Sequence, residues 1–121
     1  DHPEVAITLT NLGNAYGALG DAAKQKELLE RALAIFEKAY GPDHPEVAIT
    51  LTSLGIAYGA LGDAAKKKEL LERALPILEK AYGPGHPGVA ITLVNLGTAH
   101  GALGDAVMKK ELLERALAIN A

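Results

Sequence analysis

Four histidines are the side chains in this sequence best suited to metal binding or to acid–base chemistry. Three of them recur 42 residues apart, as His2, His44 and His86. In stacked repeats this spacing would hold them about 10 Å apart, the packing distance of neighbouring helices. Ligands of one zinc ion lie about 2 Å from it, so we expect no metal site. We expect these histidines to organise their Asp-His-Pro segments, and His100, which replaces a tyrosine, to be a core or half-buried side chain.

The remaining reactive side chains do not form a catalytic set. Ser53 is the only serine and cysteine is absent, so the sequence offers few residues for nucleophilic catalysis. Carboxylates such as Glu27 and Glu30 alternate with Lys and Arg, which is typical of a solvated helix face. The basic run at 66–68 is followed at once by Glu69. We therefore expect a chain that is not an enzyme and that needs no cofactor.

Composition excludes several further classes of function. The chain has 121 residues, 49% of them hydrophobic, and a formal net charge of −3. A weakly acidic chain does not attract nucleic acid or an anionic membrane surface. Apolar runs are only a few residues long, so we expect no membrane-spanning segment. Without cysteine, a signal peptide or such a segment, we expect a cytoplasmic protein.

The sequence consists of three copies of one unit with a period of 42 residues. The segment that begins at Asp1 returns at Asp43 and, with changes, at Gly85, which defines repeats 1–42, 43–84 and 85–121. The first two copies differ at five of 42 positions, and the third copy differs from the first at ten of its 37. Because no linker separates the copies, we expect a single solenoid domain, and we expect it to be a fragment of a longer array.

Each copy carries the pattern of two helices. Apolar residues of the second copy fall on one helical stripe, from Val47 through Leu54 to Leu61. Asp43 precedes Glu46 by three residues, which favours a capping box that Gly85 and Gly88 would remove from the third copy. Gly62-Asp63 predicts a stop and a new helix start. Each copy is therefore predicted to be an antiparallel helical hairpin of roughly 16 and 19 residues, and the fold class is predicted to be all-α.

The motif Leu12-Gly13-x-Ala15-Tyr16, followed by Gly20-Asp21 and Leu29-x-x-Ala32-Leu33, resembles the tetratricopeptide repeat. The 42-residue period looks like the branch of that family found in kinesin light chains and in large bacterial arrays. The resemblance covers the whole chain. It implies a right-handed α-α superhelix of three hairpins, whose first helices line a concave groove that binds peptides. One departure is a long polar side chain at the tight helix crossing, where the family has alanine; the positions are Gln25, Lys67 and Lys109.

The resemblance also places the groove residues. Candidate peptide-binding positions are Ile7, Thr10, Asn11 and Asn14 in the first copy, Ile49, Thr52, Ser53 and Ile56 in the second, and Ile91, Val94, Asn95 and Thr98 in the third, with Gly17, Gly59 and Gly101 extending the strip. The strip is mildly apolar and contains no Lys or Arg. It favours a segment with apolar side chains over an acidic tail.

The ends of the array are the alternative site. The core stripe of the first copy starts without a polar capping helix, and its residues are Val5, Leu9, Leu12 and Tyr16. Nearly identical copies make the two end surfaces close to complementary, so a head-to-tail homo-oligomer is possible. The sequence thus predicts a non-enzymatic scaffold that binds a protein or peptide in its groove, or, alternatively, a structural repeat that self-associates through its ends.

Overall fold

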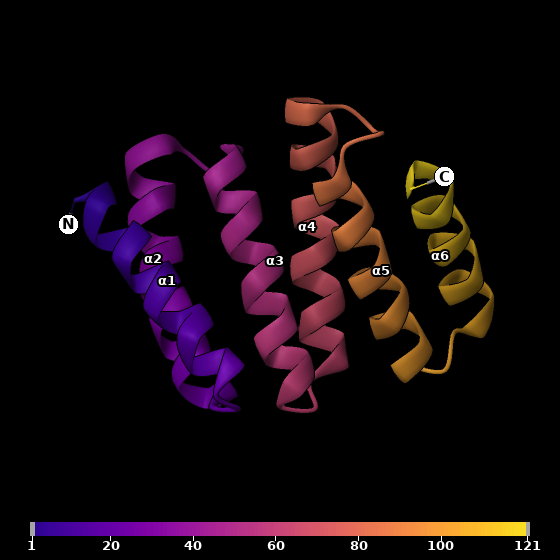
Figure 1. Ribbon diagram of the computed structural model, residues 1–121, viewed down its shortest axis with the longest axis horizontal. Coiled ribbons are helices and arrows are strands. Elements are labelled where there is room, and N and C mark those ends of the chain that lie inside the picture. Colours follow the sequence, from indigo (N-terminus) through magenta and orange to yellow (C-terminus); the bar gives the residue numbers. More distant parts are fainter. Residues whose placement is uncertain (1, 121) are drawn as a thin grey trace.

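The computed structural model describes residues 2–120, which form six helices connected by short turns. Their bounds are α1 Pro3–Ala18, α2 Ala22–Tyr40, α3 Pro45–Ala60, α4 Ala64–Tyr82, α5 Pro87–Ala102 and α6 Ala106–Asn120. Consecutive helices pair as antiparallel hairpins, and the three hairpins stand side by side (Figure 1). The all-α class and the hairpin lengths predicted from the sequence are confirmed.

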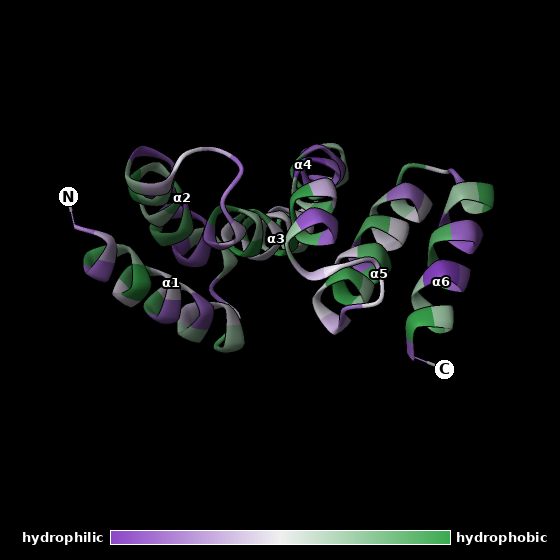
Figure 2. Cartoon of the chain, turned by 90° about the horizontal axis from the view of Figure 1, so that it is seen from above, coloured by the Kyte–Doolittle hydropathy of each residue, from purple (hydrophilic) through white to green (hydrophobic). Residues whose placement is uncertain are grey.

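The hairpins stack into a right-handed solenoid. Between hairpins, α2 packs against α3 and α4 packs against α5, so each first helix is covered by the second helix of the preceding hairpin. Seen from above, α1, α3 and α5 follow one another as a layer, with α2 and α4 behind it (Figure 2). This arrangement gives the array one face made mainly by the first helices.

The turn inside each hairpin follows the predicted stop-and-restart pattern. Gly62 adopts φ +86°, a left-handed conformation that glycine reaches without steric cost. The next residue, Asp63, caps α4: its carboxylate accepts a hydrogen bond of 3.0 Å from the N–H of Lys66. Gly20-Asp21 and Gly104-Asp105 repeat the same geometry.

The start of each first helix differs from the predicted capping box, because the cap is the histidine. Nδ1 of His44 accepts a hydrogen bond from the N–H of Glu46 at 3.1 Å. His86 does the same with the N–H of Gly88 at 3.0 Å. The prediction that Gly85 and Gly88 remove the cap from the third copy is therefore wrong, since the accepting atom belongs to His86. The expected structural role of these histidines is confirmed.

Replacing the capping histidine should destabilise its hairpin. We expect His44→Ala to lower the free energy of unfolding by about 1 kcal/mol, the usual cost of losing an N-cap acceptor. Asp43→Ala should change it by less than half of that, because Asp43 lies outside the cap. Urea unfolding followed by circular dichroism measures both, and His44→Asn should recover most of the loss. Equal losses at positions 43 and 44 would contradict the histidine cap.

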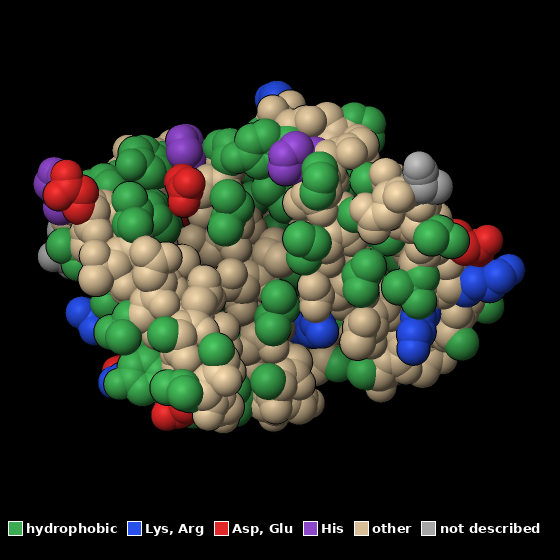
Figure 3. All heavy atoms as spheres, viewed as in Figure 1, with side chains coloured by type: hydrophobic (Ala, Val, Ile, Leu, Met, Phe, Trp, Pro, Cys, Tyr) green, Lys and Arg blue, Asp and Glu red, His purple; other side chains and the backbone are tan. Residues whose placement is uncertain are grey.

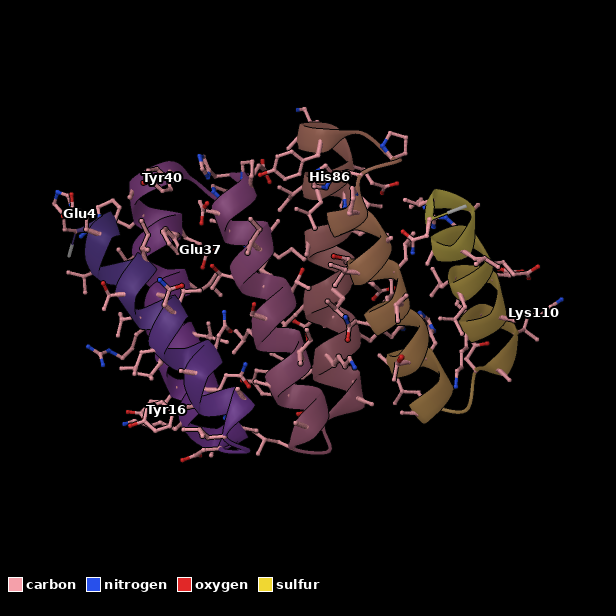
Figure 4. The ribbon with its side chains drawn as sticks, in the orientation of Figure 1. Glu4, Tyr16, Glu37, Tyr40, His86 and Lys110 are labelled. Carbon is pink, nitrogen blue, oxygen red and sulfur yellow. The ribbon has the colours of Figure 1, made fainter. Side chains whose placement is uncertain are left out.

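Polar contacts fix how neighbouring hairpins sit on each other. Arg73 on α4 pairs with Glu37 on α2 at 2.6 Å, and Arg115 on α6 repeats the contact with Glu79 at 3.4 Å. Figure 4 labels Glu37 on the side of α2 that faces the next hairpin. The Tyr58 hydroxyl donates to a Glu30 carboxylate oxygen at 3.1 Å, and burial together with this hydrogen bond raises the pKa of Tyr58. These contacts join each hairpin to the next one in the stack.

Candidate functional site

An apolar depression lies between α3 and α5 on the first-helix face. Its volume is about 460 Å³. Figure 3 shows this face, where hydrophobic side chains gather around a hollow near the centre and histidine side chains lie along the upper edge. The lining residues are Ile49, Thr52, Ser53 and Ile56 on α3, Leu78 and Tyr82 on α4, and His86, Gly88, Ile91 and Thr92 on α5. We call this depression the α3–α5 pocket.

The structure brings five of the predicted groove residues together in the α3–α5 pocket. Ile49, Thr52, Ser53 and Ile56 form one wall, and Ile91 contributes to the opposite wall. Val94 and Asn95 lie beside a smaller depression of about 250 Å³ that also contacts Ile91. The other predicted positions lie outside the α3–α5 pocket. They are Ile7, Thr10, Asn11 and Asn14 on α1, and Thr98 on α5.

Sequence analysis missed the part of the wall that comes from α4 and from the start of α5. Leu78 and Tyr82 reach the pocket from α4, and the Tyr82 ring stacks on His86 with ring centroids 4.6 Å apart. His86 lies where α5 begins, next to the end of α4 (Figure 4). The sequence does contain a signal for them, because Tyr82 precedes His86 by only four residues. This short spacing brings the end of α4 next to the start of α5.

Two threonine hydroxyls of the pocket walls are already engaged within the chain. The Thr52 hydroxyl donates to the carbonyl of Ala48 at 3.0 Å, and the Thr92 hydroxyl donates to the carbonyl of Gly88 at 3.0 Å. The two hydroxyl oxygens also approach each other to 3.4 Å across the helix interface. Both threonines are thereby held in place with their hydroxyls satisfied. The arrangement offers an apolar surface and little that could perform chemistry.

Two lysines reach the groove strip from the second helices, which corrects the expectation of a strip without Lys or Arg. The Lys67 stem lies across Gly59: a Cβ on Gly59 would come within 2.7 Å of its Cδ. Lys109 crosses Gly101 in the same way, at 2.6 Å. The glycines leave room for side chains that a larger residue would block. Lys67 is only 8% exposed, and this burial lowers the pKa of its ammonium group.

The residues proposed for the end face have two different environments. Val5 and Leu12 are 45% and 46% exposed on α1. Leu9 is buried and Tyr16 half-buried against α2, so these two belong to the first hairpin's own core. The matching residues of the second hairpin, Val47 and Leu54, are 0% and 2% exposed, because α2 covers them. Of the four predicted end-face residues, Val5 and Leu12 are therefore the ones most exposed to a partner.

Metal-binding clusters and membrane-crossing helices are both absent from the part of the chain that the structure describes. No group of three or more His, Asp or Glu side chains within residues 2–120 could hold a metal ion. Within the same range, no helix is both long enough and apolar enough to cross a bilayer.

The fold and the groove define a helical-repeat solenoid. The tetratricopeptide repeat family matches residues 4–66 and 68–121, and a second form of the repeat matches residues 47–88. The chain belongs to the tetratricopeptide repeat family. This confirms the family and the superhelical fold that the sequence motifs indicate.

Several solved structures are similar over almost the whole chain. A kinesin light chain-type protein of Podospora anserina, with nearly identical TPR-like repeats, is 31% identical with a TM-score of 0.86 and covers 98% of this chain and 56% of its own. The bacterial kinesin light chain BtubC from P. vanneervenii is 26% identical with a TM-score of 0.86, over 96% of this chain and 46% of its own. The chain thus spans about half the length of these relatives.

A more distant structure shares the fold alone. The first TPR domain of Spaghetti (RPAP3), solved with an HSP90 peptide, is 19% identical with a TM-score of 0.76, over 98% of this chain and 81% of its own. No curated protein matches the chain.

Proposed function

We propose that this chain is a non-enzymatic scaffold that binds a peptide or protein segment in the groove formed by its first helices. The observation that carries the proposal is the α3–α5 pocket, because five groove positions inferred from the sequence line one apolar depression. Proteins of the same fold support it, since the Spaghetti domain was solved with a bound peptide. Aliphatic walls and the internally bonded hydroxyls of Thr52 and Thr92 favour a bound segment with apolar side chains.

A charge in the pocket should abolish this binding. A displayed library of random 12-residue peptides, selected on the unmodified chain, supplies the probes. Ile56→Lys should weaken the affinity of the selected peptides at least tenfold, because it places an ammonium group against an apolar wall. Leu19→Lys is the matched control: Leu19 is 82% exposed at the end of α1, away from the pocket. Fluorescence anisotropy measures both, and equal affinities for the two variants would refute groove binding.

Head-to-tail self-association is a second candidate function. Val5 and Leu12 support it, because their counterparts on α3 and α5 are buried by a preceding hairpin. A second copy could cover α1 in the same manner. Sedimentation equilibrium from low to high micromolar concentration should then show a rising mass, which Leu12→Glu should abolish. Leu9 is unsuitable for this test, since it is buried within the first hairpin. A constant monomer mass would refute self-association.

A further inference from the structure

We propose that the two junctions between hairpins are not equivalent: the α3–α5 pocket holds one bulky apolar side chain of the bound segment, and the α1–α3 junction contacts a polar part of it. The proposal rests on the groove function above and names the ligand chemistry of that groove. It assigns the occupant as a segment of another protein with a single large aliphatic or aromatic anchor residue.

The differences between the first two repeats cluster at the pocket. These repeats differ at five positions: Asn11/Ser53, Asn14/Ile56, Gln25/Lys67, Ala34/Pro76 and Phe36/Leu78. Three of the five residues in the second repeat, Ser53, Ile56 and Leu78, line the α3–α5 pocket. Only six positions of that repeat line it, so differences scattered at random would place fewer than one there. The second copy therefore departs from the first mainly where it faces the pocket.

The changes at the pocket all act in one direction. Two amides of the first junction are lost: Asn11 corresponds to a smaller serine, and Asn14 corresponds to the aliphatic Ile56. The buried Phe36 corresponds to Leu78, which fills less space beside Tyr82. The pocket is consequently both more apolar and more open than the same place in the first junction.

A fourth change comes from the third repeat. Gly88 lines the pocket at the position that Glu46 occupies in the first junction. The helix start does not need the glutamate, because the imidazole of His86 supplies the cap. A carboxylate and its hydration are thus removed from the rim of the pocket without loss of the helix start. A bound apolar side chain gains more from leaving water where no charged group has to lose its hydration at the same time.

The aliphatic walls of the pocket favour an apolar anchor over a polar one. The Thr52 and Thr92 hydroxyls donate to backbone carbonyls, and the Tyr82 ring is stacked on His86. An amide or charged side chain entering between Ile49, Ile56 and Ile91 would lose its water without gaining enough partners. At the first junction, Asn11 and Asn14 are exposed on α1 and can hydrogen-bond a polar stretch of the same ligand.

Exchanging the residues of the two junctions tests the proposal. Leu78→Phe with Gly88→Glu gives the pocket two of the residues of the first junction, and Phe36→Leu with Glu46→Gly makes the reverse exchange. The probes are the selected 12-residue peptides, each paired with a copy whose largest apolar residue is replaced by Asn. We expect the first double variant to lose at least tenfold in affinity for the unmodified peptides, and the reverse variant to lose none. The Asn copies should bind weakly to every form.

The chain itself indicates that these variants fold, because each introduced residue already occupies the equivalent place in a neighbouring repeat. Ile56→Asn, which copies Asn14 at a partly exposed site, serves as a second variant and should also weaken binding tenfold. If the peptides lose affinity with Ile56→Lys but keep it with Leu78→Phe/Gly88→Glu and with Ile56→Asn, the specialised pocket is refuted and groove binding stands. Peptides indifferent to Ile56→Lys as well would overturn both proposals.

Discussion

Leu54→Ala is expected to lower the free energy of unfolding by about 3 kcal/mol, within the range of 2–5 kcal/mol usual for a buried leucine. Leu54 lies on α3 and is 2% exposed, because α2 of the preceding hairpin packs over it. Its truncation leaves a cavity between two hairpins, and the helices can fill this cavity only if the hairpins shift relative to each other. Urea unfolding of the chain, followed by circular dichroism, measures the loss.

The matched control is the same substitution one repeat earlier. Leu12 occupies the equivalent position of α1 but is 46% exposed, so Leu12→Ala should cost less than about 1 kcal/mol. The comparison is well matched because the preceding residues of the two helices differ only at Asn11 and Ser53. Similar losses at low protein concentration would contradict the described packing. A loss at Leu12 that grows with protein concentration would instead indicate that another copy covers α1.

The fold follows from local signals that the sequence repeats three times. Helical stripes, the Gly62-Asp63 turn and the hairpin lengths depend on residues close in sequence, and they are confirmed. The sequence predicts the cap at Asp43, one residue too early, because general N-cap preferences favour Asp over His. His44 is the cap instead, and the Tyr40 ring stacks on its imidazole at a centroid distance of 4.4 Å.

The pocket could be predicted only in part, since its walls come from three helices. The α3 wall follows from the repeat pattern, because the helical period aligns Ile49, Thr52 and Ile56 on one face. The contributions of Leu78 and Gly88 depend on how the second hairpin meets the third, which is a matter of packing between repeats. The path of Lys67 across Gly59 also depends on packing. The two residues lie on different helices and meet only when α3 and α4 pack together as a hairpin.

Lys67→Met is expected to stabilise the chain by about 1 kcal/mol at pH 7, because an apolar side chain of similar length replaces a largely buried ammonium group. Burial lowers the pKa of Lys67 in the folded chain below the value of about 10.4 for a lysine in an unfolded chain. The unfavourable contribution of the charge is therefore complete below the folded pKa, and it is relieved as the pH rises from there towards 10.4. The stability advantage of methionine should accordingly shrink between pH 7 and pH 10.

Urea unfolding of both proteins at pH 7 and pH 10 measures this change, and the other titrating groups cancel when the two proteins are compared at each pH. Lys109→Met is the matched control, since Lys109 crosses Gly101 in the same way but is exposed on α6 and already hydrated. Its substitution should change stability little at either pH. An advantage of Lys67→Met that stayed constant with pH would mean that methionine acts through packing alone, and that desolvation of the ammonium group contributes nothing to the cost of lysine at this crossing.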